Sequence, residues 1–155
     1  MIGEKILHLQ DPSGGLKPYP FSYGKKPMSC REGSLGTPWG LHEVGAKIGS
    51  ESPAGMIFRG RVPTGECWHQ REDAGPSQEN FVTTRILRLR GLESGLNAGP
   101  GIDSFDRCIY IHGTNHPEHF PENISSGCLL MLDGDLVRLF DTVGPGTHVY
   151  IHRDY

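Results

Sequence analysis

The sequence lacks the features that mark several common classes of protein. No apolar run approaches the roughly 18 residues of a membrane-spanning helix, so no span is predicted. The first ten residues carry Glu4 and Lys5 where a signal peptide needs its apolar core, so no signal peptide is visible. An excess of positive charge is also missing, since the formal net charge is -3. Nucleic acid and anionic membrane are therefore not expected partners.

Cysteine pairs at metal-binding or redox spacing are absent as well. The chain has four cysteines, Cys30, Cys67, Cys108 and Cys128, and none of them forms a CxxC pair. This pattern disfavours a zinc knuckle or a thioredoxin-type motif. An even count permits two disulfides, but a chain of 155 residues buries enough surface to fold without them. We therefore expect free thiols.

Glycine and proline are abundant, with 22 and 12 residues, and they separate many short apolar segments. The alternation within those segments predicts strands at Lys5–Leu9, Tyr19–Tyr23, Leu41–Ile48, Met56–Arg61, Phe81–Leu89, Arg107–His112, Leu129–Leu132 and His148–His152. Apolar residues at helical spacing predict one helix over Gly134–Val143, with Asp133 as its N-cap. A turn is expected at Pro63–Gly65 and an irregular surface excursion at Trp68–Asn80. We interpret residues 1–155 as a single, mainly β domain, a sandwich or barrel of short mixed strands with one late helix.

The segment Ile109–Met131 carries the strongest indication of chemistry. One predicted strand ends at His112, and the next begins just after Cys128. If the two strands lie side by side, the loop between them returns both side chains to the same end of the sheet. A thiol nucleophile needs a base within about 2.6–3.2 Å. Gly127, which has no Cβ, would let a substrate approach and let backbone N–H groups face an oxyanion.

Other interpretations of these residues stay open at this point. Free cysteines are often simply buried, and a histidine that follows an apolar run is often a core residue. A zinc site made by His112, His116 and His119 with Cys128 is a further alternative, although its spacing matches no usual zinc motif.

The motifs taken together resemble a known family. HGTN at 112–115, S-x-G-C at 125–128, the following apolar run, LFDTV and GT-x-V-x-I are similar to the YkuD-type L,D-transpeptidase catalytic domain of bacterial cell-wall enzymes. TPWG at 37–40 and the segments FRGRVPTGECW and VTTRILRLRGLESGLN extend the resemblance to a compact single-domain branch. The likeness covers the chain from about Gly36 to Ile151.

The resemblance implies roles for individual residues. Cys128 matches the acyl-accepting nucleophile and His112 its base, while Gly113 matches the residue whose backbone carbonyl holds the other histidine nitrogen. Gly127 and the N–H of Cys128 fall in the oxyanion hole. The further oxyanion or substrate-binding candidates are Ser125, Ser126, Thr114 and Asn115. The family usually has a basic residue at position 126 and Arg or Asn at position 130, where this chain has Ser126 and Leu130. Arg85 is the candidate to supply the positive charge.

The resemblance also implies a reaction. The enzyme would attack the third-residue carbonyl of a peptidoglycan stem tetrapeptide, release D-alanine and pass the acyl group to an amine, which gives a 3→3 cross-link. No metal or organic cofactor is expected, carbapenem-type β-lactams are expected inhibitors, and the cell envelope or periplasm is the expected location. Two alternatives remain: a carboxypeptidase that uses water as acceptor, or a catalytically weak wall-binding module.

Overall fold

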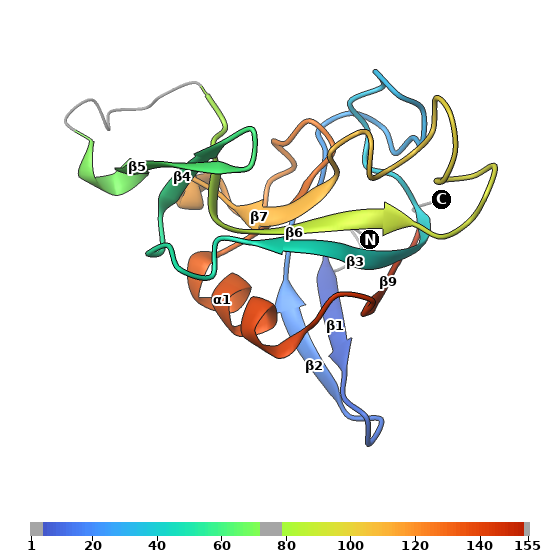
Figure 1. The fold of residues 1–155 in the computed structure, drawn as a ribbon, viewed down its shortest axis with the longest axis horizontal. Helices are drawn as coiled ribbons and strands as arrows, with labels where there is room; N and C mark the ends of the chain where they lie inside the picture. Colours follow the sequence, from blue (N-terminus) through green and yellow to red (C-terminus); the bar gives the residue numbers. More distant parts are fainter. Residues whose placement is uncertain (1–4, 72–78, 154–155) are drawn as a thin grey trace.

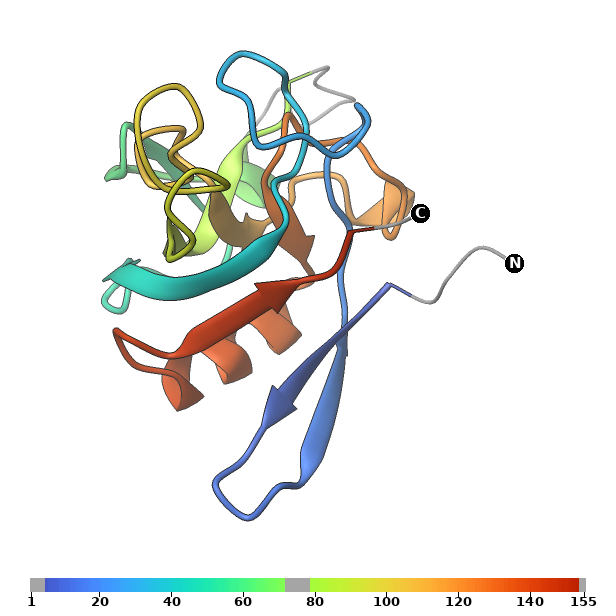
Figure 2. The same ribbon diagram turned by 90° about the vertical axis from the view of Figure 1, so that its right-hand side faces the viewer.

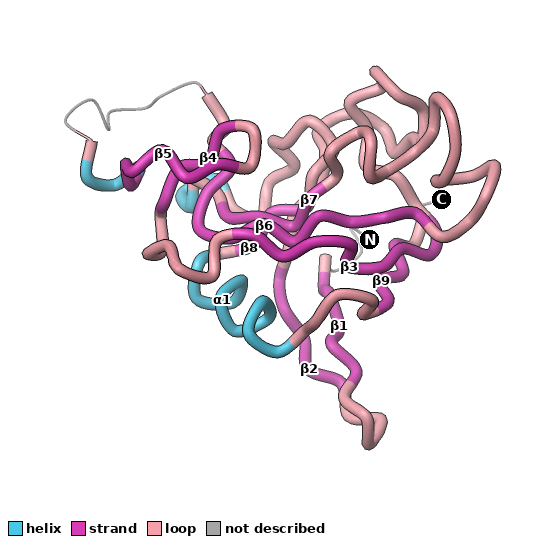
Figure 3. Tube along the Cα trace, viewed as in Figure 1, coloured by secondary structure: helices cyan, strands magenta, loops and turns pink. Residues whose placement is uncertain are grey.

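A computed structural model describes residues 5–71 and 79–153, and this part of the chain is mainly β, as predicted. Figure 3 distinguishes the strands from the few helical turns. The strands are β1 (Ile6–Gln10), β2 (Leu16–Pro20), β3 (Gly40–Ile48), β4 (Met56–Arg59), β5 (Val62–Cys67), β6 (Val82–Gly91), β7 (Tyr110–Gly113), β8 (Leu129–Met131) and β9 (His148–Ile151). The helical elements are α1 (Asp133–Thr142) and the 3-10 turns η1 (Trp68–Gln70) and η2 (Pro117–His119). In the described ranges no helix is long and apolar enough to cross a membrane.

Strand β6 organises the seven-stranded sheet. One of its edges pairs with β4 and then with β3, and its other edge pairs with β7. Strand β9 extends the sheet beyond β3, β5 extends it beyond β4, and β8 extends it beyond β7. The pairs are antiparallel except β7 with β8, which run parallel. Strands β1 and β2 form a separate antiparallel hairpin below the sheet (Figure 1).

The two faces of the sheet bury different clusters. Leu87, Ile111 and Leu129 point to the face covered by helix α1, where they meet Leu136 and Phe140. Figure 2 shows α1 beneath β3 and β9. This burial is the main stabilising term for the domain, because apolar area removed from water contributes about 25 cal/mol per Å².

The hairpin β4–β5 folds over the opposite face. Met56, Phe58 and Cys67 of the hairpin pack against Ile86 and Tyr110, and Cys108 and Cys128 pack at the margin of this cluster. In Figure 1 the turn of this hairpin points toward β7. The face that carries Tyr110 is thus covered by a hairpin instead of a helix.

Two local predictions in the first half of the chain need correction. The residues Pro63–Gly65 lie inside β5, and the hairpin turn is at Gly60–Arg61 instead. Proline is tolerated in β5 because this strand is at the edge of the sheet. The predicted second strand is shifted toward the N-terminus, to Leu16–Pro20. Of the predicted excursion Trp68–Asn80, residues 72–78 lie outside the described residues.

Helix α1 forms as predicted, but Asp133 is not its N-cap. The cap position is Leu132, whose side chain makes no capping hydrogen bond. Asp133 is the first helical residue, and its carboxylate accepts the Thr84 hydroxyl at 2.6 Å. Its negative charge still lies at the helix N-terminus, where the helix dipole favours it.

Candidate active site

Cys128 and His112 are brought together by the parallel pairing of β7 with β8. His112 lies opposite Leu130, and Ile111 lies opposite Leu129. Cys128, one residue before β8, is therefore opposite Tyr110, whose N–H donates to the Cys128 Sγ at 3.4 Å. Since side chains alternate between the faces of a sheet, Cys128 and His112 are diagonal neighbours on one face. The expected side-by-side arrangement of the two strands is confirmed.

The Cys128 thiol is held by two backbone groups. It accepts the Tyr110 N–H and donates to the carbonyl of Cys108 at 3.5 Å. Although the residue as a whole is only partly buried, its sulfur lies among backbone groups and apolar side chains, and burial raises the pKa of the thiol to about 11. The Tyr110 N–H and the charge of Arg107 act against this rise. The thiol is therefore protonated at neutral pH in the free protein.

The His112 imidazole is fixed by its neighbour along the chain. The ring is buried, with 5% of its surface exposed, and its Nδ1 lies 2.6 Å from the carbonyl oxygen of Gly113. Leu130 on β8 and Ile86 on β6 are its cross-strand neighbours, and both are apolar and buried. Burial in these surroundings lowers the pKa of His112 to about 4, against a smaller opposing effect of the Gly113 carbonyl. The imidazole is neutral at physiological pH.

Gly127 occupies a backbone conformation that favours glycine. Its φ is +118°, and a Cβ at this position would lie 3.1 Å from the carbonyl oxygen of Gly36. Ser125 braces the same turn, because its hydroxyl donates to the Cys128 carbonyl at 2.6 Å and accepts the Gly127 N–H at 3.4 Å. Ser126, in contrast, is exposed. The turn before the thiol is thus held by side chains and backbone that converge on Gly127.

Thr37 is a site residue to which the sequence analysis gave no role. Its buried hydroxyl donates to the Gly127 carbonyl at 2.9 Å and accepts the Gly24 N–H at 2.8 Å. Arg107 approaches the same place, since its guanidinium donates to the Gly36 carbonyl at 2.7 Å. Thr37 belongs to the TPWG motif, which was the available signal.

The side chains of Thr114 and Asn115 hold the loop that follows β7. The Thr114 hydroxyl accepts the His116 N–H at 3.0 Å. The Asn115 amide accepts the Phe81 N–H at 2.8 Å and donates to the Glu79 carbonyl at 2.9 Å. Both residues are buried. The structure therefore places them as loop supports, with these polar atoms already paired inside the protein.

Arg85 does not lie beside Cys128, which corrects the sequence-based expectation. Its guanidinium donates to the carbonyls of Ser52 and Thr84, and it lies 5.6 Å from the ring centre of Phe140 in helix α1. Phe140 belongs to the helix-covered face, opposite the face of Cys128. Leu87 and Leu89, which follow Arg85 at two-residue spacing in β6, belong to the same face.

The residues of the zinc alternative do not form a metal cluster. In residues 5–71 and 79–153, no group of three or more His, Cys, Asp or Glu side chains is arranged to hold a metal ion. His116 is instead 3.2 Å from the Glu118 carboxylate, and His119 is exposed. His112 uses its Nδ1 for the Gly113 carbonyl.

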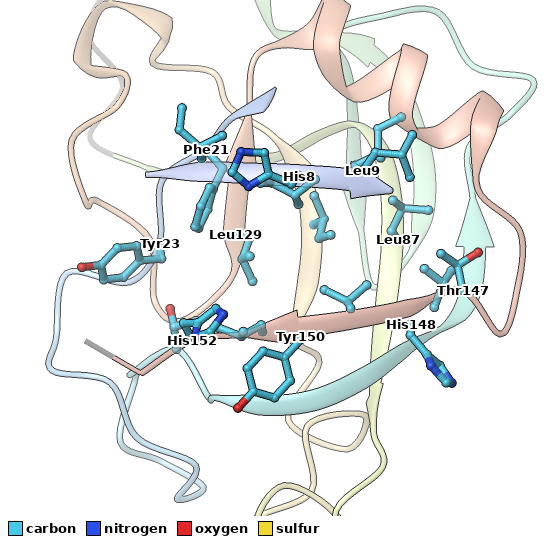
Figure 4. Close-up of a pocket in the computed structure, with 18 of the residues that line it drawn as sticks. His8, Leu9, Phe21, Tyr23, Leu87, Leu129, Thr147, His148, Tyr150 and His152 are labelled. Carbon is cyan, nitrogen blue, oxygen red and sulfur yellow. The ribbon is translucent and has the colours of Figure 1, made fainter. Parts of the chain in front are cut away.

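A large groove lies on the other face of the sheet. It has a volume of about 940 Å³, and Figure 4 shows it between the first hairpin and β9, with His8, His148 and His152 among its lining residues. Ile111 and Leu129 line it, and these residues alternate with His112 and Cys128. The groove is therefore separated from the candidate site by the sheet.

Comparisons with known proteins give a family model and a curated relative. Residues 2–151 match the family model of YkuD, described as the L,D-transpeptidase catalytic domain. The "Putative L,D-transpeptidase YqjB" of Bacillus subtilis (strain 168) is 34% identical over 96 residues, which are 54% of each protein. This chain thus matches about half the length of that curated relative.

Two solved structures have a similar fold. The crystal structure of Mycobacterium tuberculosis L,D-transpeptidase 1 is 17% identical, with a TM-score of 0.50, over 97% of this chain and 57% of that one. The structure of LD transpeptidase LdtMt1 in complex with imipenem is 15% identical, with a TM-score of 0.53, over 97% of this chain and 56% of that one. At this identity the two structures support the fold alone.

Proposed function

The chain belongs to the YkuD family of L,D-transpeptidase catalytic domains, and on this basis we propose that it is a cysteine-dependent L,D-transpeptidase that acts on peptidoglycan stem peptides. The observation that carries the proposal is the placement of Cys128 and His112 on one face of adjacent parallel strands. The bond between His112 and the Gly113 carbonyl supports it, because it leaves the other ring nitrogen available as a base. The cell envelope, where peptidoglycan lies, is the corresponding location.

The reaction begins with two neutral groups. As the Cys128 sulfur bonds to the third-residue carbonyl carbon of a stem tetrapeptide, its proton passes to Nε2 of His112. Proton transfer must accompany attack, because burial keeps the thiol protonated and the imidazole neutral beforehand. The backbone N–H of Cys128 stabilises the resulting oxyanion. The Gly113 carbonyl stabilises the imidazolium that forms.

The tetrahedral intermediate then collapses. The bond to the terminal D-alanine breaks, and the imidazolium returns its proton to the leaving amine, which leaves a thioester on Cys128. An amine of a second stem attacks this thioester and gives up a proton to His112. The thiolate leaves and is reprotonated, and the product is a 3→3 cross-link. If water attacks instead, the same acyl-enzyme gives a tripeptide, which is the carboxypeptidase outcome.

A carbapenem tests the nucleophile directly. One structural neighbour was solved in complex with imipenem, and we propose that imipenem acylates Cys128 of this chain. Intact mass measurement after incubation should detect one adduct on the native protein and on Cys108→Ala, and no adduct on Cys128→Ala. An adduct that persists in Cys128→Ala, or a native protein that never forms one, would contradict the proposal.

Product analysis tests the acceptor. The native protein is incubated with a disaccharide tetrapeptide, and the products are separated by mass. Cross-linked dimers that disappear in Cys128→Ala support transpeptidation, whereas tripeptide alone supports hydrolysis. Binding to peptidoglycan sacculi without any turnover would favour the weak wall-binding module and would count against both enzymatic functions.

A further inference from the structure

We propose that Arg61, at the tip of hairpin β4–β5, forms an anion-binding subsite beside Cys128 that recognises a carboxylate of the substrate. This inference rests on the proposed function and adds to it the source of substrate selectivity. The family's usual basic residue is replaced at position 130 by a leucine that is buried, and Arg85 lies on the other face of the sheet. Arg107 does act on the thiol, but its guanidinium donates to the carbonyls of Ser29 and Gly36. A cation with donors left for a substrate carboxylate therefore has to come from another part of the chain.

The backbone at Arg61 is unusual for an arginine. Arg59 pairs with Val62, so Gly60 and Arg61 form a two-residue turn, and their φ angles are +53° and +66°. Turns of this kind favour glycine, asparagine or aspartate, and a left-handed conformation costs other residues about 1 kcal/mol or more. Strained residues of this kind cluster at functional sites, which motivates a search for the role of this side chain.

The side chain of Arg61 reaches the partner strand of the nucleophile. Its Nη1 donates to the Tyr110 hydroxyl at 3.2 Å and lies 3.8 Å from the Cys108 Sγ. Tyr110 also donates its backbone N–H to the Cys128 Sγ. One residue thus contacts both the guanidinium and the candidate nucleophile, and Cys108 contacts both as well. The hairpin tip is anchored beside the site on the face that Cys128 occupies.

The guanidinium groups of Arg61 and Arg88 both contact the Cys108 thiol. Arg88 lies opposite Tyr110 in the sheet register, and its Nη2 is 3.9 Å from the Cys108 Sγ. In the described part of the chain neither Arg61 nor Arg88 forms a salt bridge, whereas Arg90 pairs with Glu43. Two cations without a carboxylate partner therefore approach the thiol of Cys108, whose backbone carbonyl accepts a hydrogen bond from the Cys128 thiol. Nε and Nη2 of Arg88 donate to the Phe105 carbonyl, so of the two Arg61 has more donors left for an anionic ligand.

The donor geometry of Arg61 fits a carboxylate. A guanidinium has five N–H donors in a planar fork, which matches the two oxygens of a carboxylate. Within the described residues the hydrogen bonds of Arg61 are made through Nη1, the residue as a whole is exposed, and Nε and Nη2 make no hydrogen bond there. A stem tetrapeptide has two carboxylates near the reacting carbonyl, one at its terminus and one on the side chain of a diaminopimelate third residue. Arg61 would bind one of them.

The first test measures the local preference for anions without any turnover. The rates at which iodoacetate and iodoacetamide alkylate Cys128 are compared by peptide mass analysis, because these reagents differ chiefly in charge. Arg61→Gln should lower the ratio of the two rates about fivefold at low salt, the size expected for one charge a few ångströms away. The matched control, Arg90→Gln, removes the same charge from the exposed Glu43 pair and should leave the ratio unchanged.

A glycine variant separates the subsite from folding. Arg61→Gly relieves the left-handed backbone, so it should unfold at the same or a higher temperature than the native protein while still losing the preference for iodoacetate. A ratio equal to that of the native protein in both Arg61→Gln and Arg61→Gly would overturn the proposal.

The second test uses substrate and identifies the carboxylate. Tetrapeptides are amidated either at the terminus or at the third-residue side chain. Arg61→Gln should raise KM for the unmodified peptide with little change in kcat, and it should have no effect on the peptide whose bound carboxylate is amidated. If the native protein has no turnover but the alkylation ratio falls in Arg61→Gln, the proposed function fails and the subsite stands. If turnover occurs and neither KM nor the ratio changes, the subsite fails and the function stands.

Discussion

The Nδ1 of His112 lies 2.6 Å from the carbonyl oxygen of Gly113, and this contact determines how the ring can be used. A carbonyl only accepts hydrogen bonds, so Nδ1 carries the proton and Nε2 carries the lone pair. A backbone acceptor cannot be removed by a side-chain substitution at position 113. The tautomer of this histidine is therefore set by the main chain of β7.

The pKa of His112 predicts a pH-dependent loss of stability. Because the folded pKa is about 4 and the ordinary value is 6.5, the unfolded state binds the extra proton first as pH falls. The contribution of His112 should be complete above about pH 6.5 and lost as the pH falls through 4. It should amount to about 3 kcal/mol in the free energy of unfolding. Denaturant unfolding between pH 4 and 7 measures it.

The control for this prediction is His112→Gln. The buried His42, whose pKa burial also lowers, remains in both proteins, so the difference between their two pH profiles isolates His112. Profiles that run parallel from pH 7 to pH 4 would contradict the assignment.

The raised pKa of Cys128 predicts a thiol with low reactivity at neutral pH. Alkylation by iodoacetamide requires the thiolate, whose fraction rises tenfold per pH unit below a pKa of about 11. The rate at Cys128 should therefore increase about tenfold per unit from pH 6 to pH 9, as measured by quenched labelling and peptide mass analysis. A plateau that begins near pH 7 would mean that the free protein holds a thiolate, and it would refute this prediction.

Gly127→Ala should destabilise the turn before the nucleophile for two reasons. The left-handed backbone costs an alanine about 1–2 kcal/mol, and its Cβ would lie 3.1 Å from the Gly36 carbonyl. Gly146→Ala is the matched control, because Gly146 has a φ of +88° but no atom within 4 Å of the added Cβ. Thermal unfolding should give a larger loss for Gly127→Ala, together with slower acylation by imipenem. Equal losses would exclude the steric effect.

Leu130→Arg, which introduces the residue common in the family, should lower the stability of the folded protein. Leu130 is 2% exposed and lies opposite the His112 ring, so the new charge would be buried without a partner. We expect a loss of roughly 3 kcal/mol in the free energy of unfolding. Leu16→Arg is the control, since Leu16 is 62% exposed and should change stability by no more than about 0.5 kcal/mol. An undiminished stability of Leu130→Arg would show that the site can accept a charge.

The sequence predicts the strands around the site because their signals are local. The apolar alternation before His112 and the apolar run after Cys128 indicate β7 and β8, and the long polar loop between them allows the two strands to run parallel. The helical spacing of Leu136, Leu139 and Phe140 likewise predicts α1. These elements form where local preference and tertiary packing agree.

The predictions fail where tertiary packing, and not local sequence preference, determines the conformation or position of a residue. The Gly60–Arg61 turn is not predicted, because an arginine at positive φ contradicts local preference. Arg85 is expected to supply a charge at the site, but it shares the helix-covered face with Leu87 and Leu89. The sequence does not show which face of the sheet carries Cys128. The sequence contains no indication that Arg61 lies near the site, since its contact with Tyr110 depends on a hairpin that folds over the sheet.

The two backbone bonds between Ser22 and Leu130 give the N-terminal part of the chain a further importance. Strand β8 has only three residues, and a slip of two positions along β7 would keep every side chain on its present face. Because Ser22 holds β8 from its outer edge, that slip would break both bonds. A segment that precedes the thiol by about a hundred residues therefore fixes the register of β8 against β7, and with it the position of the sulfur.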